Sequence, residues 1–144
     1  MARVRKAAPV RYRYQYAVKF LCLANIPGTS STSESVLPGV YQTVVNIHNP
    51  NLREVRIREK IAVPGQEPSK FKDDSLKPDF AKSVNCRQIT QEFGILFIHG
   101  AEGFFVIEST LSLDVVAVYT AGARGGEVAS IDVEQIRERK ISSW

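Results

Sequence analysis

The chain of 144 residues has few of the residue types that build catalytic or metal centres. Its two cysteines and two histidines stand in separate segments, and no pair of them has a ligand spacing that zinc sites use. No serine or cysteine lies in a motif that would supply a nucleophile with a base. The sequence therefore predicts a protein that is not an enzyme and has no metal and no cofactor. The residues concerned are Cys22, Cys86, His48 and His99.

Long apolar runs are also missing. No run reaches the roughly 20 residues that a membrane-spanning helix needs, and Arg11, Arg13 and Lys19 interrupt any apolar core of a secretory signal. We therefore expect no membrane span and a cytoplasmic location. In that compartment Cys22 and Cys86 would be buried thiols, whereas an oxidising compartment would allow one disulfide.

Acidic residues are absent from the first 33 positions, which contain six bases. The remaining residues contain 13 bases and 15 acids, so the net charge of +4 combines a strongly basic N-terminus with a mildly acidic body. A basic arm on an acidic body is weaker evidence for a nucleic-acid-binding domain than the whole-chain charge suggests.

The sequence does contain segments with the residue pattern of β-strands. The segment 103–122, GFFVIESTLSLDVVAVYTAG, has two stretches of β-branched and aromatic residues joined by a polar break. They are expected to pair as the central antiparallel hairpin. The second stretch is apolar on both faces except at Asp114 and Thr120, which predicts that both faces are covered.

Alternating patterns predict further strands at 10–22, 40–48, 52–63, 95–98 and 128–136. Glu59 falls on the apolar face of its strand; a strand end or bulge is the preferred explanation, and a buried partner is the alternative. Helical spacing at 79–93, with Asp79 as a possible cap, predicts one short helix or helical turn.

These elements predict an all-β fold, a single antiparallel β-sandwich of about seven strands with a short helix near 79–93. The domain boundaries follow from composition: a basic arm and the start of the first strand at 1–15, a β-sandwich at 16–136 and a charged tail at 137–144.

Four stretches carry a resemblance: YAVKFLCL (16–23), PGVYQTVVNIHNPN (38–51), 103–122 and SIDVEQI (130–136). They resemble a pattern in small uncharacterised bacterial β-sandwich proteins, and the order of elements is similar to the sensory rhodopsin transducer family. That family consists of small oligomeric β-sandwiches implied to bind partners or ligands. The resemblance implies a non-catalytic, self-associating domain, and it assigns no ligand site.

Three functions remain open. The preferred one is a structural or scaffold protein that forms a homo-oligomer or larger assembly through its basic arm and sheet edges. The second is binding of nucleic acid or another anionic surface by the Arg- and Tyr-rich N-terminus, and the third is a small-ligand-binding or signal-transducing sandwich. The predicted assembly contacts are Arg3, Arg5, Lys6, Arg11, Tyr12, Arg13, Tyr14, Tyr16, Asp132, Glu134 and Trp144.

Overall fold

The computed structural model describes residues 3, 8–94, 100–123 and 125–142. These residues form an all-β fold with one short helix, as the sequence predicts. The predicted strand at 95–98 lies outside the described residues, as do Arg5, Lys6, His99 and Trp144. The elements in chain order are β1 (Tyr14–Asn25), β2 (Gly39–His48), β3 (Val55–Ala62), β4 (Lys72–Leu76), β5 (Ala81–Val84), α1 (Cys86–Glu92), β6 (Gly100–Ser109), β7 (Asp114–Gly122), β8 (Val128–Gln135) and β9 (Glu138–Lys140).

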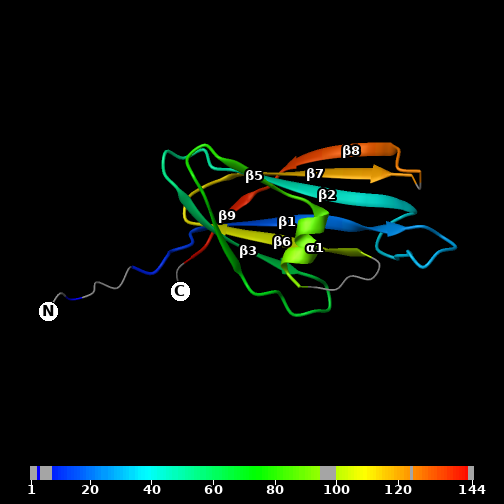
Figure 1. Ribbon diagram of the computed structural model, residues 1–144, viewed down its shortest axis with the longest axis horizontal. Helices are drawn as coiled ribbons and strands as arrows, with labels where there is room; N and C mark the ends of the chain where they lie inside the picture. Colours follow the sequence, from blue (N-terminus) through cyan, green and yellow to red (C-terminus); the bar gives the residue numbers. More distant parts are fainter. Residues whose placement is uncertain (1–2, 4–7, 95–99, 124, 143–144) are drawn as a thin grey trace.

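All strand pairs are antiparallel and follow the order β4-β3-β6-β1-β2-β7-β8, with β5 beside β2 and β9 beside β1 (Figure 1). β1 and β2 pair only over residues 23–25 and 39–41. Beyond that contact no ladder joins β1 to β2 among the described residues, so the sheet has two parts, one with β4, β3, β6, β1 and β9 and the other with β2, β5, β7 and β8. Buried side chains come from both parts: Tyr16, Val18 and Phe20 of β1, Val45 and Ile47 of β2, Val55, Ile57 and Ile61 of β3, Phe105 and Ile107 of β6, and Val115 and Ala117 of β7.

The predicted central hairpin is wrong. β6 pairs with β1 and β3, whereas β7 pairs with β2 and β8, so the two strands lie in different parts of the sheet. The connection between them turns inward and buries Leu113 in the core. An apolar pattern shows that a strand is buried but not which strand it pairs with, and this is why the sequence suggested the closer partner.

The first strand, β1, begins four residues after the start of the alternating sequence pattern that predicted it. Alternation starts at Val10, but β1 begins at Tyr14, where residues 14–16 pair with β9 on one side and β6 on the other. The segment expected to be a C-terminal tail therefore contributes a strand to the sheet. Residues 8–12 precede the strand and lead away from it (Figure 1).

The region predicted as a helix is divided between β5 and α1. The helix begins after Asn85, whose side chain accepts a hydrogen bond from the Gln88 amide, while the Gln88 side chain accepts one from the Asn85 amide. Asn85, and not Asp79, is thus the cap. Only Ile89 of the helix is fully buried, and Phe80, expected on the helix's apolar face, is exposed.

A disulfide joins Cys22 of β1 to Cys86, the first residue of α1. The expectation of two free thiols is therefore wrong, and the oxidised alternative is the one observed. The bond closes a sequence separation of 64 residues and attaches the helix to the strand at the centre of the sheet.

Candidate binding surfaces

The basic N-terminal residues border a cleft of about 610 Å³. Arg11 and Arg13 are exposed, and Tyr12 and Tyr14 are half-buried. Arg58 of β3 and Lys140 of β9 join them in lining the cleft. The sequence suggested no second basic strip beside the arm, because positions 58 and 140 become neighbours of residue 12 only in the folded sheet.

The Tyr12 ring of this cleft already has a partner within the chain. The Arg58 guanidinium lies 4.3 Å from the centroid of the Tyr12 ring and 4.0 Å from that of Phe71. Arg58 also donates two hydrogen bonds to Glu108, at 2.8 and 2.5 Å. One face of Tyr12 is therefore covered and the charge of Arg58 is balanced, which leaves Arg11, Arg13 and Lys140 as the exposed cations.

Tyr16 is only 1% exposed and belongs to the core of its own chain. Its hydroxyl donates to Glu138 at 2.5 Å and accepts from the Leu113 amide at 2.7 Å. Burial, and then the bond to Glu138, raises the pKa of Tyr16 to about 12. Tyr16 is thus removed from the predicted assembly contacts; its role is to hold β9 on β1. Arg3, another predicted contact, is exposed.

β8 is an edge strand whose eight residues are all exposed. Its register places Asp132 opposite Tyr119 and Glu134 opposite Ala117, so both carboxylates lie on the inner face of β7. Burial, and then these two carboxylates, raises the pKa of Tyr119 to about 12. The two predicted acidic contacts therefore lie together on one face of a strand edge.

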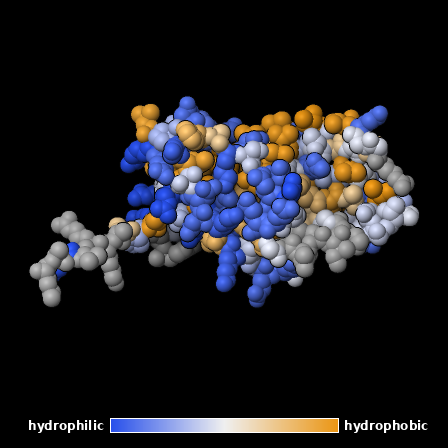
Figure 2. All heavy atoms as spheres, in the orientation of Figure 1, coloured by the Kyte–Doolittle hydropathy of each residue, from blue (hydrophilic) through white to orange (hydrophobic). Residues whose placement is uncertain are grey.

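The opposite face of the same strands is apolar. Ile131 and Val133 are 65% and 63% exposed, and the register aligns Val133 with Val118 of β7, which in turn aligns with Val44 of β2. Val116 and Val118 are only half-buried. The prediction that both faces of this strand are covered is therefore wrong: one face packs on the core, and within the described chain the other is open. Figure 2 shows apolar residues gathered along β7 and β8.

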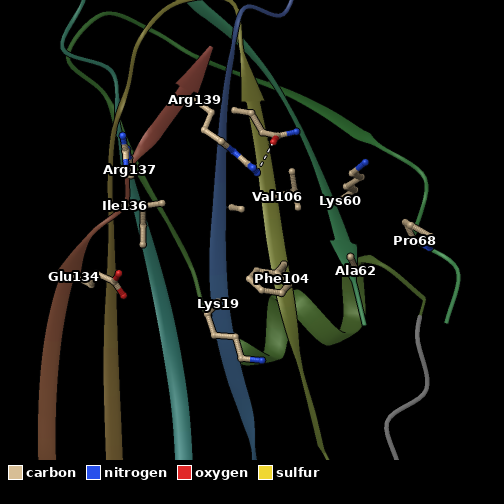
Figure 3. A pocket seen from close by; sticks show the side chains of 12 residues that line it. Lys19, Lys60, Ala62, Pro68, Phe104, Val106, Glu134, Ile136, Arg137 and Arg139 are labelled. Atoms are coloured by element: carbon tan, nitrogen blue, oxygen red, sulfur yellow. Dashed lines mark hydrogen bonds between the residues drawn. The ribbon is translucent and has the colours of Figure 1, made fainter. Parts of the chain in front are cut away.

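A larger groove of about 710 Å³ lies on the face of β1, β3 and β6 that points away from the core (Figure 3). Ala17, Ala62, Phe104 and Val106 form its apolar floor. The end of β8 and the segment leading into β9 form one wall with Glu134, Ile136 and Arg137. Sequence reasoning missed this groove, although the apolar residues on both faces of β6 were a signal for it.

Four cations line the groove: Lys19, Lys60, Arg137 and Arg139. Lys19 forms an ion pair with Glu102 at 2.9 Å, and Arg139 donates to the neutral Gln15 side chain at 2.8 Å. The Lys60 ammonium lies 4.7 Å from the centroid of the Phe71 ring. Glu134 is the one acidic residue among the described residues that line the groove, so the groove combines an apolar floor with a positive rim.

Two charged clusters hold the fold together. Buried Glu59 is 1% exposed and accepts a 2.8 Å bond from Lys82, which also binds Asp74 at 2.7 Å. Burial raises the pKa of Glu59 despite Lys82. Burial acts to lower the pKa of Lys82, but its two carboxylate partners raise it overall. Glu59 therefore lies within a paired strand and has a partner, the partly exposed Lys82, so the preferred strand end or bulge is wrong.

The second cluster surrounds His48, which is half-buried at the end of β2. Its ring nitrogens lie 2.8 Å from Asp114 and 2.8 Å from Asp79. The hydrogen bonds to Asp114, and then to Asp79, raise the pKa of His48. The cluster links β2, the start of β7 and the loop before β5.

Within the described ranges, no three His, Cys, Asp or Glu side chains are grouped so that they could hold a metal ion. No described helix has the length and apolar composition needed to cross a membrane.

Comparisons with known proteins give a likeness in fold. No family model matches the sequence, and no curated protein matches it either. The structure is similar to the crystal structure of Thermotoga maritima 1070, with a TM-score of 0.57 over 88% of this chain and 92% of that one. The two sequences are 7% identical, so the similarity concerns the fold alone.

Proposed function

We propose that this protein is a non-catalytic structural protein whose copies assemble by adding the basic N-terminal segment of one copy to the β8 edge of the next. The observation that carries the proposal is the exposed edge of β8, where the strand pairs with β7 on one side only among the described residues. Such an edge has unpaired backbone N–H and C=O groups that accept an additional strand.

The side chains of the two segments are complementary. In β8, Ile131 and Val133 face one side and Asp132 and Glu134 the other. In the N-terminal segment, exposed Val10 precedes exposed Arg11. With the same period of two, an added strand would place its apolar residues beside Ile131 and Val133 and its bases beside the carboxylates.

This mode joins two different surfaces, so it is heterologous and forms either a closed ring or an open filament. Among the described residues of the segment, Val10 and Arg11 are exposed, whereas the Tyr12 ring packs against Arg58 of its own chain. From Arg13 onward the segment is bound to its own chain, since the Arg13 amide donates to Ser109 and its carbonyl accepts from Ile141.

The decisive experiment measures the mass of the native particle by light scattering. The full chain and Leu52→Lys are expected to form the same oligomer, while Val133→Lys and a chain lacking residues 1–11 are expected to be monomeric. Leu52 is the matched control because it is 95% exposed and lies outside the strands. A monomeric full chain, or an unchanged oligomer in Val133→Lys, would contradict the proposal.

Charge reversal tests the pairing directly. Asp132→Lys with Glu134→Lys should prevent assembly, and adding Arg11→Glu should restore part of it because opposite charges again face each other. Glu54→Lys, an exposed carboxylate away from β8, is the control. A double variant that assembles normally would show that charge plays no part.

The second candidate function is binding of single-stranded nucleic acid, which is favoured by the meeting of Arg11, Arg13 and Lys140 at one cleft. Affinity for an oligonucleotide should then fall steeply as salt rises from low to moderate concentration. Fluorescence anisotropy with Lys140→Gln tests this, and no binding at low salt would eliminate it.

The expected cytoplasmic location remains a prediction. The Cys22–Cys86 disulfide argues against it, because such bonds are uncommon in reducing compartments. Thiol labelling of the protein taken directly from cells would decide the matter.

A further inference from the structure

We propose that the groove on the outer face of β1, β3 and β6 binds a small amphiphilic carboxylate of the fatty-acid type. The apolar chain would lie on the floor around Phe104, and the carboxylate would be held by the rim cations. The groove shares one wall residue, Glu134, with the edge used for assembly, but the proposal does not depend on assembly.

The floor is apolar where a solvent-facing sheet surface is ordinarily polar. Tyr16 and Val18 of β1 enter the core, so the intervening Ala17 faces outward; in the same way Phe105 enters the core while Phe104 faces the groove. Ala17 and Ala62 are small, and the hollow lies above them. Phe104 is 46% exposed within it, so part of its ring is available to a ligand.

Among the described residues, the rim has more positive than negative charge: four cations and one carboxylate, Glu134, line the groove. Lys19 has Glu102 as its partner. In the described part of the chain, Lys60, Arg137 and Arg139 have no carboxylate within ion-pairing distance. Figure 3 shows Lys60 on one side of Phe104 and Arg137 on the other, so cations stand on both sides of the floor.

This combination selects the chemistry of the ligand. An apolar floor without charge would favour a neutral lipid, and a basic surface without an apolar floor would favour a polyanion. The groove offers both, and its volume lies within the range of ligand pockets, roughly 300–1,000 Å³. Guanidinium groups are suited to a carboxylate because they can donate two parallel hydrogen bonds.

The test is isothermal titration calorimetry with three probes below their micelle concentrations: dodecanoate, dodecyltrimethylammonium and acetate. Dodecanoate should saturate one site per chain. Dodecyltrimethylammonium has the same alkyl chain with the opposite charge, and acetate has the carboxylate without the long alkyl chain. Neither compound should therefore saturate the site. Equal binding of the two dodecyl compounds would overturn the proposal.

Variants locate the site. Arg137→Gln should weaken dodecanoate binding about tenfold, as expected for one charge-assisted hydrogen bond, and Ala62→Trp should abolish binding by filling the floor. Arg53→Gln removes one positive charge outside the groove and should have no effect. Unchanged binding in both groove variants would overturn the proposal, and if Ala62→Trp does not fold, Arg137→Gln and Lys60→Gln decide.

Val133→Lys separates this site from the assembly edge. It should retain dodecanoate binding whether or not the chain is monomeric. Loss of binding in Val133→Lys, with Arg137→Gln unaffected, would mean that the probe binds between copies and that the proposed site is wrong.

Discussion

The two outer strands of the sheet, β4 and β8, meet solvent in different ways. β4 has five residues, three of which are charged, and short charged edges discourage pairing with other chains. β8 has eight residues, and its exposed Ile131 and Val133 form an apolar surface beside a free edge. The comparison teaches that one flank ends in a short, charged strand, while the other ends in a longer strand with exposed apolar side chains.

The flank that ends in β4 is also better connected to the rest of the chain. Lys82 of β5 bridges Asp74 of β4 and Glu59 of β3, and Lys72 of β4 pairs with Glu92 of α1 at 3.3 Å. β8, by contrast, pairs with β7 alone in the described part of the chain, and that ladder has a register shift between Ala121 and Gly122. Variants on the two flanks should therefore differ in their effect on stability.

The largest effect on stability is expected from removing the Cys22–Cys86 disulfide. Replacing both Cys22 and Cys86 by Ala should lower the free energy of unfolding by about 4 kcal/mol, because the bond closes a long loop in the unfolded chain. Denaturant titration measures this, and the unreduced parent chain is the reference. If adding a reductant to the parent protein causes no comparable loss, the bond does not stabilise the fold.

A matched pair of substitutions tests the contrast itself. Ile57→Ala on β3 should cost about 3 kcal/mol, since Ile57 is fully buried and its removal leaves a cavity. Ile131→Ala on β8 should change the stability of the monomer by less than about 0.5 kcal/mol. Thermal unfolding at low protein concentration measures both, and similar losses would remove the distinction between the flanks.

A smaller loss is expected at the charge bridge. Lys82→Gln leaves the buried Glu59 carboxylate without its cation and should cost about 2 kcal/mol, reduced from the full value for a buried pair because Lys82 is partly exposed. Lys70→Gln is the exposed control. Adding Glu59→Gln should recover part of the loss; a further loss instead would show that Glu59 does not depend on Lys82.

The smallest effect concerns pH. The pKa of His48 is raised in the folded protein by Asp114 and Asp79, so folding favours the protonated ring. This contribution is complete below the ordinary pKa of about 6.5 and disappears as pH rises through the higher folded value. Melting temperatures of His48→Gln should lack this decline, and parallel profiles for the two proteins would contradict it.

Local patterns in the sequence predicted much of the fold. The alternation of Val55, Ile57 and Ile61 with charged residues placed β3 and its buried face correctly. Patterns could not place β6 and β7 in different parts of the sheet, because strand partners are chosen by packing across the whole chain. The helix was predicted too long for a similar reason. Residues 81–84 form β5 because they pair with β2, and the spacing of apolar residues at 79–84 gives no information about that pairing.

The binding surfaces were predicted less completely. The basic arm and the acidic residues of β8 could be read from charge alone. The groove could not, since Lys60, Phe104 and Arg137 are distant in sequence and are brought together by the pairing of β6 with β1 and β3 and of β9 with β1. The partner of Glu59 was missed because Lys82 lies in a segment that was expected to be helical.

The bond between Tyr16 and Glu138 spans 122 positions, and this has a consequence for how the protein is made. During synthesis Tyr16 leaves the ribosome 122 residues before Glu138, so its hydroxyl cannot make this bond until Glu138 has emerged. Contacts between residues far apart in sequence form late and slow folding. β1 therefore cannot pair with β9 until β9 has been translated. A nascent chain stalled before residue 138 would still expose the surface of β1 that β9 covers.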